Sequence, residues 1–193
     1  GANADITPED IDASADIIRS AGMLLLQLEI PMPAVVRAAE IAHESGVKVV
    51  LNPAPATKLP EELLRCVSIL IPNETEASAI SGIDITDLKT AGKAANMLKS
   101  KGVREIIITM GSRGSVVCDG ETTFIPAMKV NAVDTTAAGD TFCGGVCVAL
   151  SEGKDIYDAV RFATVASSIA VQRPGAQDSV PSRQEVDYIM NNN

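Results

Sequence analysis

The sequence has few features of proteins that bind nucleic acid or cross a membrane. Only 16 Lys and Arg stand against 25 Asp and Glu, and the net charge of −9 disfavours a protein that tracks a phosphate backbone. The longest apolar stretch, within residues 23–29, is far too short to span a bilayer, and no secretory signal pattern is visible. We therefore expect no nucleic-acid partner, no membrane partner and a cytoplasmic location.

Histidine and cysteine are also scarce, which argues against an ordinary zinc site. The chain has one histidine, His43, and four cysteines, no two of which form a CxxC pair. His43 stands near the end of an amphipathic helical pattern, where a solvated imidazole is a simpler interpretation than a base for a thiolate nucleophile. We interpret the cysteines as small apolar side chains in a reducing compartment. They are Cys66, Cys118, Cys143 and Cys147.

Apolar runs recur along the first part of the chain. With 193 residues, of which 46% are hydrophobic, the chain is long enough for one domain with a substantial core. Runs that are apolar on both faces, such as EIIIT at 105–109, alternate with helical patterns, as in a parallel sheet that helices cover on both sides. The predicted strands are 23–29, 47–52, 67–71 and 105–109. The predicted helices are 34–44, 60–64, 74–81 and 88–100.

The second part of the chain predicts a hairpin followed by helices. Residues 114–118 and 122–125 flank Asp119 and Gly120, a pair typical of a type I′ hairpin turn. No flexible linker divides the chain, so we predict a single α/β domain over residues 1–193, with an antiparallel edge late in the sheet. Ligands of such sheets bind beyond the carboxyl ends of the strands. The predicted helices of this part are 138–150, 156–171 and 184–190.

The segment with the clearest chemical signal is 133–145, VDTTAAGDTFCGG, where a polar turn leads into a helix of small residues. Small residues at a helix start let backbone N–H groups approach a ligand, and these donors together with the helix dipole favour an anion. Asp140 would repel that anion unless it accepts a proton, as a general base does in phosphoryl transfer. The alternative is an ordinary capped helix, for which Asp and Thr are also suitable.

The order of these residues resembles a family signature. DTTAAGD followed by TFCGG is similar to the second signature of the ribokinase-like carbohydrate kinases, the phosphofructokinase-B superfamily. Its pattern is Asp-Thr, a variable residue, Gly or Ala, and Ala-Gly-Asp; Ala137 stands where many members have Gly. The resemblance implies a three-layer α/β/α ribokinase-like fold, with a mostly parallel sheet and a late antiparallel hairpin. Within the superfamily it leans towards the ribokinases.

Three further segments resemble family motifs in order and spacing. Asn73 and Glu76 resemble the Asn-x-x-Glu motif of the magnesium and phosphate site, although the same pair is also a capping-box pattern. Residues 109–114, TMGSRG, resemble the nucleotide loop, although a plain β-turn would also fit them. Residues 173–181, RPGAQDSVP, resemble a loop beside the adenine pocket that helps to hold a monovalent cation.

The resemblance implies a catalytic role for each part of the signature. Asp140 would contact the sugar and, as the general base, deprotonate the 5-hydroxyl of D-ribose for attack on the γ-phosphate of ATP. The amides of Ala137, Ala138 and Gly139 would form the anion hole. Glu29 matches a sugar-contacting acid, with an exposed charge at a strand end as the alternative.

Cofactor and nucleotide contacts follow from the same resemblance. Glu76 would order the water shell of Mg²⁺, and a monovalent cation, K⁺ in most such enzymes, would act indirectly on the anion-hole turn. The residues that match contacts to ATP are Asn73, Thr109, Met110, Gly111, Ser112, Arg113, Gly114, Gly139 and Thr164. The residues that match the monovalent-cation site are Asp134, Thr136, Ala170, Arg173, Gly175 and Ser179.

Family features of the N-terminal part do not occur in this sequence. These are a sugar-gripping Asp-x-Asn, a GGKGAN-type segment, and the small β-sheet lid through which such enzymes commonly dimerise. We therefore expect the C-terminal, nucleotide-binding part of a longer homodimeric enzyme. Alone, this part should have little activity, because most groups that position the sugar are absent.

Other functions stay open. A related kinase could act on adenosine, fructose, a ketodeoxy sugar acid or a pyrimidine nucleoside, since sugar choice depends largely on the N-terminal residues. A non-catalytic module that binds MgATP without transferring phosphate is a second alternative. A Rossmann-type dehydrogenase is disfavoured because no GxGxxG follows an early strand, and a purely structural domain would leave the surroundings of Asp140 unexplained.

Overall fold

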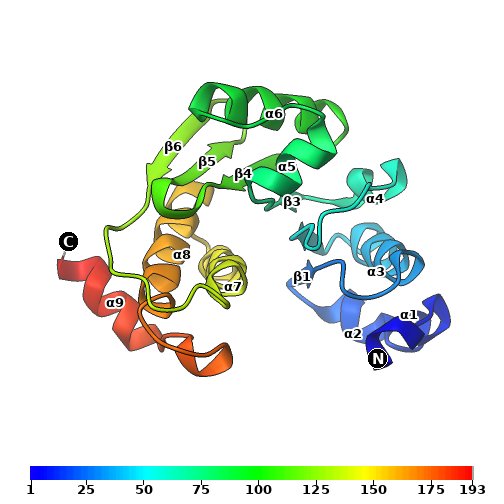
Figure 1. The fold of residues 1–193 in the computed structure, drawn as a ribbon. Helices are drawn as coiled ribbons and strands as arrows, with labels where there is room; N and C mark the ends of the chain where they lie inside the picture. The colour runs from blue at the N-terminus through cyan, green and yellow to red at the C-terminus, as the bar shows by residue number, and fades with distance from the viewer. Residues whose placement is uncertain (193) are drawn as a thin grey trace. The chain divides into compact units, whose positions relative to one another are not determined.

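The computed structural model describes residues 1–192 and contains one six-stranded sheet in the order β1-β2-β3-β4-β5-β6 (Figure 1). The first four strands are parallel, as the buried apolar runs predict. The strands are β1 (Met23–Leu26), β2 (Lys48–Leu51), β3 (Ile69–Leu70), β4 (Glu105–Thr109), β5 (Gly114–Cys118) and β6 (Thr122–Pro126).

The chain forms two compact units, which we describe separately. The first, named the sheet unit, contains Gly1–Met110 and Val116–Phe124. The second, named the helical unit, contains Gly111–Ser115 and the chain from Ile125 onward. The single domain predicted over residues 1–193 stays a prediction.

The first three parallel strands are shorter than the predicted runs. The run predicted at 67–71 forms a strand only at Ile69–Leu70. The N–H of Val67 donates to the carbonyl of Leu63 at 3.2 Å and ends a helix, while Ser68 and Ile71 still donate to Val49 and Leu51 of β2, at 2.9 and 2.8 Å. The run predicted at 23–29 ends at Leu26, and the N–H of Leu28 then donates to the carbonyl of Ala54 at 2.8 Å. The centres of the runs are buried as expected, with Ile106, Ile107 and Ile108 at 0% exposure.

The sheet unit has six α-helices among the described residues. Two of them, α1 and α2, pack against α3 and were not predicted, although Thr7, Pro8 and Asp10 form a capping box with proline at the helix start. The main core lies in this unit, between the strands and apolar helix faces such as Val35, Ala39 and Ala42 of α3. The helices are α1 (Pro8–Ala13), α2 (Ala15–Ser20), α3 (Met32–Glu44), α4 (Glu61–Cys66), α5 (Glu74–Ser81) and α6 (Leu88–Ser100), after a 3-10 turn, η1 (Ala2–Asp5).

The predicted hairpin is present, but its turn is not of type I′. Three residues, 119–121, join β5 to β6, and only four join β4 to β5. Connections this short make neighbouring strands antiparallel, because a parallel pair needs a crossover of about a dozen residues. A type I′ turn requires a positive φ at both central residues, and no described residue other than glycine has one, so Asp119 excludes that turn.

Three α-helices form most of the helical unit. They are α7 (Ala138–Ser151), α8 (Ile156–Ala170) and α9 (Arg183–Asn192), with 3-10 turns η2 (Gly111–Arg113) and η3 (Gln177–Ser179). Helix α7 packs on α8, and α8 packs on α9, where the Arg183 guanidinium carbon lies 5.2 Å from the centre of the Phe162 ring. All three helices were predicted, with ends that differ by at most two residues.

Candidate active site

In the sheet unit, predicted site residues meet at the carboxyl ends of β3 and β4. Asn73 follows β3 after Pro72 and forms an isolated parallel bridge with Thr109, the last residue of β4. The N–H of Thr109 donates to the carbonyl of Pro72 at 2.9 Å. Parallel strands end at one edge of their sheet, so residues 36 positions apart in the sequence become neighbours.

Asn73 and Glu76 hold each other at the start of α5. The Asn73 N–H and side-chain Nδ2 donate to Glu76 Oε2 and Oε1, each at 2.8 Å, and the Glu76 N–H donates to Asn73 Oδ1 at 2.9 Å. The capping box that was the alternative interpretation of this motif is therefore present. Glu76 is 6% exposed, and its burial raises the pKa of the carboxyl while the bonds from Asn73 lower it. Each carboxylate oxygen keeps a second lone pair for a further donor such as a metal-bound water.

Glu29 lies beyond the carboxyl end of β1 and is exposed. Two backbone hydrogen bonds hold the preceding residues beside the segment that follows β2. The Asn52 N–H donates to the Leu26 carbonyl at 2.9 Å, and the Leu28 N–H donates to the Ala54 carbonyl at 2.8 Å. Both interpretations of Glu29, a sugar contact and a plain surface charge, agree with this exposure. Met110, by contrast, is 2% exposed within the core, so its side chain is not available to a ligand.

In the helical unit, α7 begins without a side-chain cap. Its N-cap is Ala137, no side chain there accepts from the helix N–H groups, and Asp140 stands exposed in the first turn. The Ala138 N–H donates to the Thr135 carbonyl at 3.2 Å, so this predicted anion-hole donor also serves the turn. Apart from its chain neighbours and the backbone of α7, a Cβ atom built on Gly139 would have no heavy atom within 4 Å. At this helix end the N-cap Ala137 is buried at 8% exposure, Ala138 is half-buried, and Gly139 and Asp140 are exposed, with open space at Gly139.

The predicted nucleotide loop forms η2, a tight turn between β4 and β5. Gly111 has a φ of 55° and Gly114 a φ of 127°, values that favour glycine. A Cβ on Gly114 would lie 2.1 Å from the Ile125 carbonyl oxygen, whereas one on Gly111 would meet nothing within 4 Å. Gly114 is thus required by the fold, while Ser112 and Arg113 between the two glycines are exposed.

Asp134 joins the turn before α7 to the loop after α8. Its Oδ1 accepts from the Thr136 N–H at 2.9 Å and from Thr136 Oγ1 at 2.6 Å. Its Oδ2 accepts from the Gly175 N–H at 3.0 Å, across 41 positions of the sequence. These bonds lower the pKa of Asp134, the Thr136 side-chain bond most of all. The carboxylate is therefore ionised at neutral pH and joins two loops of the predicted monovalent-cation site.

Further residues of that predicted site lie in the same stretch of chain. The Arg173 N–H donates to the carbonyl of Ala170 at 3.0 Å, just after the end of α8. Ser179 is 1% exposed and its hydroxyl donates to the Ala176 carbonyl at 2.7 Å, within η3 rather than towards Asp134. Among the described residues, no three His, Cys, Asp or Glu side chains are grouped as metal ligands.

Three buried hydroxyls near these segments differ in their partners. Thr164 is 9% exposed and its Oγ1 donates to the Val160 carbonyl at 2.8 Å, a bond inside α8. Its predicted nucleotide contact stays a prediction. Ser115 Oγ and Thr141 Oγ1 are buried with no hydrogen-bond partner among the described atoms. Neither residue was predicted from the sequence to belong to a site, although Thr141 directly follows Asp140.

No described helix combines the length and the apolar character needed to cross a membrane. No disulfide joins the four cysteines in the described part of the chain, where burial raises the pKa of the Cys147 thiol to about 11.

Comparison with known proteins gives consistent matches along the chain. Residues 1–183 match the family described as pfkB family carbohydrate kinase. A protein named ribokinase from Staphylococcus aureus is 45% identical over 191 residues, which are 98% of this chain and 63% of that protein. The chain thus spans less than two thirds of the length of this relative.

Solved structures agree with the sequence matches. A structure of Arabidopsis thaliana ribokinase complexed with ribose and ATP has a TM-score of 0.89 and 35% identity, covering 93% of this chain and 59% of that one. A ribokinase from Thermotoga maritima has a TM-score of 0.90 and 39% identity, covering 99% of this chain and 63% of that one. These similarities confirm the predicted ribokinase-like α/β fold.

Proposed function

Because the chain belongs to the pfkB family of carbohydrate kinases, we propose that these residues form the nucleotide-binding part of an ATP-dependent sugar kinase, which phosphorylates the 5-hydroxyl of D-ribose. The observation that carries the proposal is the start of α7, where a carboxylate stands in the first turn of a helix that no side chain caps. Ribose is supported by the names of the relatives and by the ribose and ATP of the Arabidopsis thaliana complex.

We assign the chemical step to Asp140. Its exposed carboxylate would accept the proton of the sugar hydroxyl as that oxygen attacks the γ-phosphate of ATP, a role worth about 10²- to 10⁴-fold in rate. The backbone amides of Ala137, Ala138 and Gly139 would stabilise the charge that develops on the transferred group. The open space at Gly139 supports this role, because a phosphate needs room to approach the backbone.

Residues that the family resemblance assigns to ATP occur in the sheet unit and in the helical unit. In the sheet unit these are Asn73 and Thr109 at the sheet edge, together with the backbone of Met110. In the helical unit they are Gly139 and Thr164, along with the loop residues Gly111, Ser112, Arg113 and Gly114. Support comes from the bridge between Asn73 and Thr109 and from the glycine conformations of the loop. Glu29 would bind the sugar.

The residues present fit Mg²⁺ held mainly by phosphate and water. Glu76 would bind it through a water molecule, since both carboxylate oxygens already accept bonds from Asn73 yet keep a lone pair each. When bound with ATP, Mg²⁺ supplies positive charge that offsets the phosphates.

The residues also fit a monovalent cation beside the anion-hole turn. Asp134 offers an ionised carboxylate, and Thr136, Ala170, Arg173, Gly175 and Ser179 offer backbone or hydroxyl oxygens in the same loops. Support for the assignment is the bond from Gly175 to Asp134, which brings the two loops together. Potassium, a homodimer and a cytoplasmic location stay predictions from the family resemblance.

The test is ADP release by the full-length protein with ribose, ATP, Mg²⁺ and K⁺, compared across ribose, fructose, adenosine and a ketodeoxy sugar acid. We expect the highest kcat/KM with ribose. A higher value with another acceptor would reassign the substrate, and ATP binding without ADP release would favour the non-catalytic module. The 193 residues alone are expected to bind MgATP with little transfer.

A further inference from the structure

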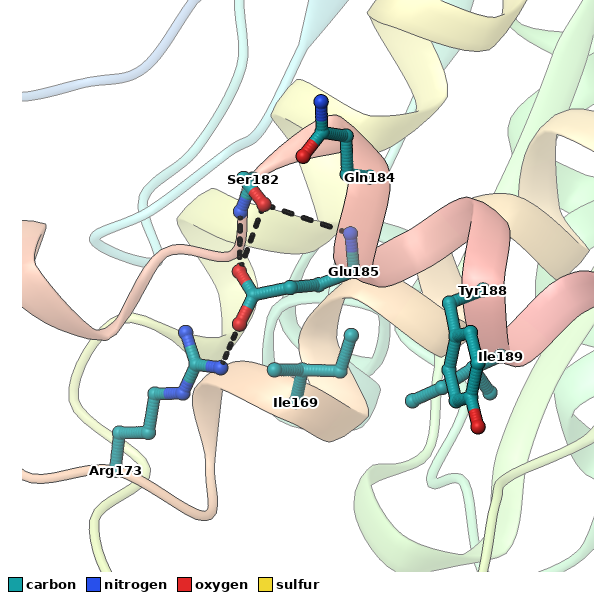
Figure 2. Close-up of a pocket in the computed structure, with 7 residues that line it drawn as sticks. All are labelled: Ile169, Arg173, Ser182, Gln184, Glu185, Tyr188 and Ile189. Carbon is teal, nitrogen blue, oxygen red and sulfur yellow. Dashed lines mark hydrogen bonds and ion pairs between the residues drawn. The ribbon is translucent and has the colours of Figure 1, made fainter.

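One carboxylate joins the start of α9 to the loop that follows α8. Glu185 Oε2 accepts from the Ser182 N–H at 2.8 Å and from Ser182 Oγ at 2.9 Å, and Glu185 Oε1 pairs with the Arg173 guanidinium. Figure 2 shows the Glu185 side chain reaching from α9 between Ser182 and Arg173. All three residues line a surface cavity of about 380 Å³. Glu185 thus holds the Arg173 side chain against the end of α9.

The same loop is held from its other side by Asp134. Only Pro174 separates Arg173 from Gly175, whose N–H donates to Asp134 Oδ2 at 3.0 Å. The proline ring fixes one backbone angle of this short connection. The ion pair of Arg173 and the bond of the Gly175 N–H thus lie two residues apart in one short connection.

Asp134 carries this restraint to the start of α7. Its other oxygen accepts from the backbone and hydroxyl of Thr136, at 2.9 and 2.6 Å. Thr136 directly precedes Ala137, the N-cap of α7. In the order of the contacts, the connection runs from Glu185 through Arg173, Gly175, Asp134 and Thr136, and every member lies in the helical unit.

The ion pair of Arg173 and Glu185 contributes little to the free energy of unfolding. Its side chains are 36% and 43% exposed, and exposed ion pairs contribute up to about 1 kcal/mol. Helix α9 also has a second anchor, the pair of Arg183 with Glu152 at the end of α7, with 46% and 36% of the side chains exposed. This second pair has no bond to the loop of Arg173, which makes it a matched control.

We propose that Glu185 is a positioning residue for phosphoryl transfer, which sets the turn before α7 by holding Arg173. It touches neither of the reacting groups. The inference rests on the proposed function for its kinetic consequence, but the restraint on the turn can be measured without any activity.

The experiment compares Glu185→Ala and Glu185→Gln with the control Glu152→Gln in the full-length protein. Amide hydrogen exchange of residues 134–140 is expected to be about fivefold faster in Glu185→Ala than in the wild type, the factor that corresponds to losing about 1 kcal/mol. The control should match the wild type in this segment. Glu185→Gln should lie between the two, because its one amide oxygen can accept from Arg173 or Ser182 but not fully replace both carboxylate oxygens.

Kinetics supply the second readout. Glu185→Ala is expected to lower kcat about fivefold and to change KM for ATP less, since most of the proposed ATP contacts lie outside the turn. Unchanged exchange at residues 134–140, or equal effects of Glu185→Ala and Glu152→Gln, would overturn the proposal. Faster exchange in a protein that phosphorylates no sugar would support the restraint of the turn by Glu185 and reject the proposed function.

Discussion

A Cβ atom built on Gly145 would lie 2.9 Å from the Cα atom of Ala163. The backbones of α7 and α8 therefore approach as closely as a glycine allows, and this contact fixes the helix whose first turn carries Asp140. A Cβ atom built on Gly144, one position earlier in α7, would have no such neighbour within 4 Å.

Replacing each of the two glycines by alanine should change the free energy of unfolding differently. Gly145→Ala should lower the free energy of unfolding by about 1–3 kcal/mol, because the added methyl overpacks the contact with α8. Gly144→Ala should leave it unchanged or raise it by up to about 1 kcal/mol, since alanine is the better helix former. Urea unfolding measures both; equal effects of the two substitutions would contradict the close approach.

Gly139→Ala tests the proposed anion hole in a variant whose stability should be close to that of the wild type. The added methyl would meet no atom beyond its own helix backbone and chain neighbours, so the free energy of unfolding should stay within about 0.5 kcal/mol of the wild type. It would, however, occupy the space through which a phosphate reaches the backbone, and kcat should fall on the order of 10²-fold. The matched control is Gly144→Ala, which should keep its kcat. Full activity of Gly139→Ala would exclude this helix end as the site of transfer.

Asp140→Asn separates a kinase from a nucleotide-binding module. The amide is close to the carboxylate in shape but is a poor proton acceptor at neutral pH, so transfer should fall about 10²- to 10⁴-fold. Binding of MgATP, measured by titration calorimetry, should stay within about threefold of the wild type if the residue acts only on the proton. An active Asp140→Asn enzyme would remove Asp140 from the role of base.

Asn73 and Asp87 allow the capping role of the Asn-x-x-Glu motif to be separated from a ligand role. Both residues are N-caps in capping boxes, of α5 and α6 respectively. Replacing either by alanine should lower the free energy of unfolding by about 1 kcal/mol. Only Asn73→Ala should also weaken ATP binding, because Asn73 alone lies at the sheet edge beside Thr109. If both variants bind ATP like the wild type, Asn73 is a cap and nothing more.

Glu105 predicts a pH dependence of stability. Burial at the start of β4 raises the pKa of its carboxyl above the ordinary 4.5, against the opposing effect of Lys48. The folded state therefore holds the proton longer than the unfolded state, and its stability falls as the pH rises from about 4.5. Glu105→Gln should flatten this fall and raise the free energy of unfolding at pH 7. A variant whose pH profile parallels that of the wild type would contradict the assignment.

Features that depend on near neighbours in the sequence were predicted well. The strand at 105–109 and the helix at 88–100 were found with the predicted ends, because a run of isoleucines and a regular apolar spacing leave few alternatives. The failures have equally local causes. The helices at the N-terminus were missed despite a capping box at Thr7, and the turn at Asp119 was assigned from its residue pair although three residues connect the strands.

The candidate site divides in the same way. The sequence alone determined the small-residue turn before α7, Asp140 in the first helical turn and the capping pair of Asn73 with Glu76, since these groups lie within a few positions of one another. Only the tertiary structure decided that Asn73 lies beside Thr109, that the Gly175 N–H bonds to Asp134, and that Glu185 pairs with Arg173. Such contacts close long loops of chain, and packing of the sheet and of α7 on α8 provides the free energy that offsets this entropy.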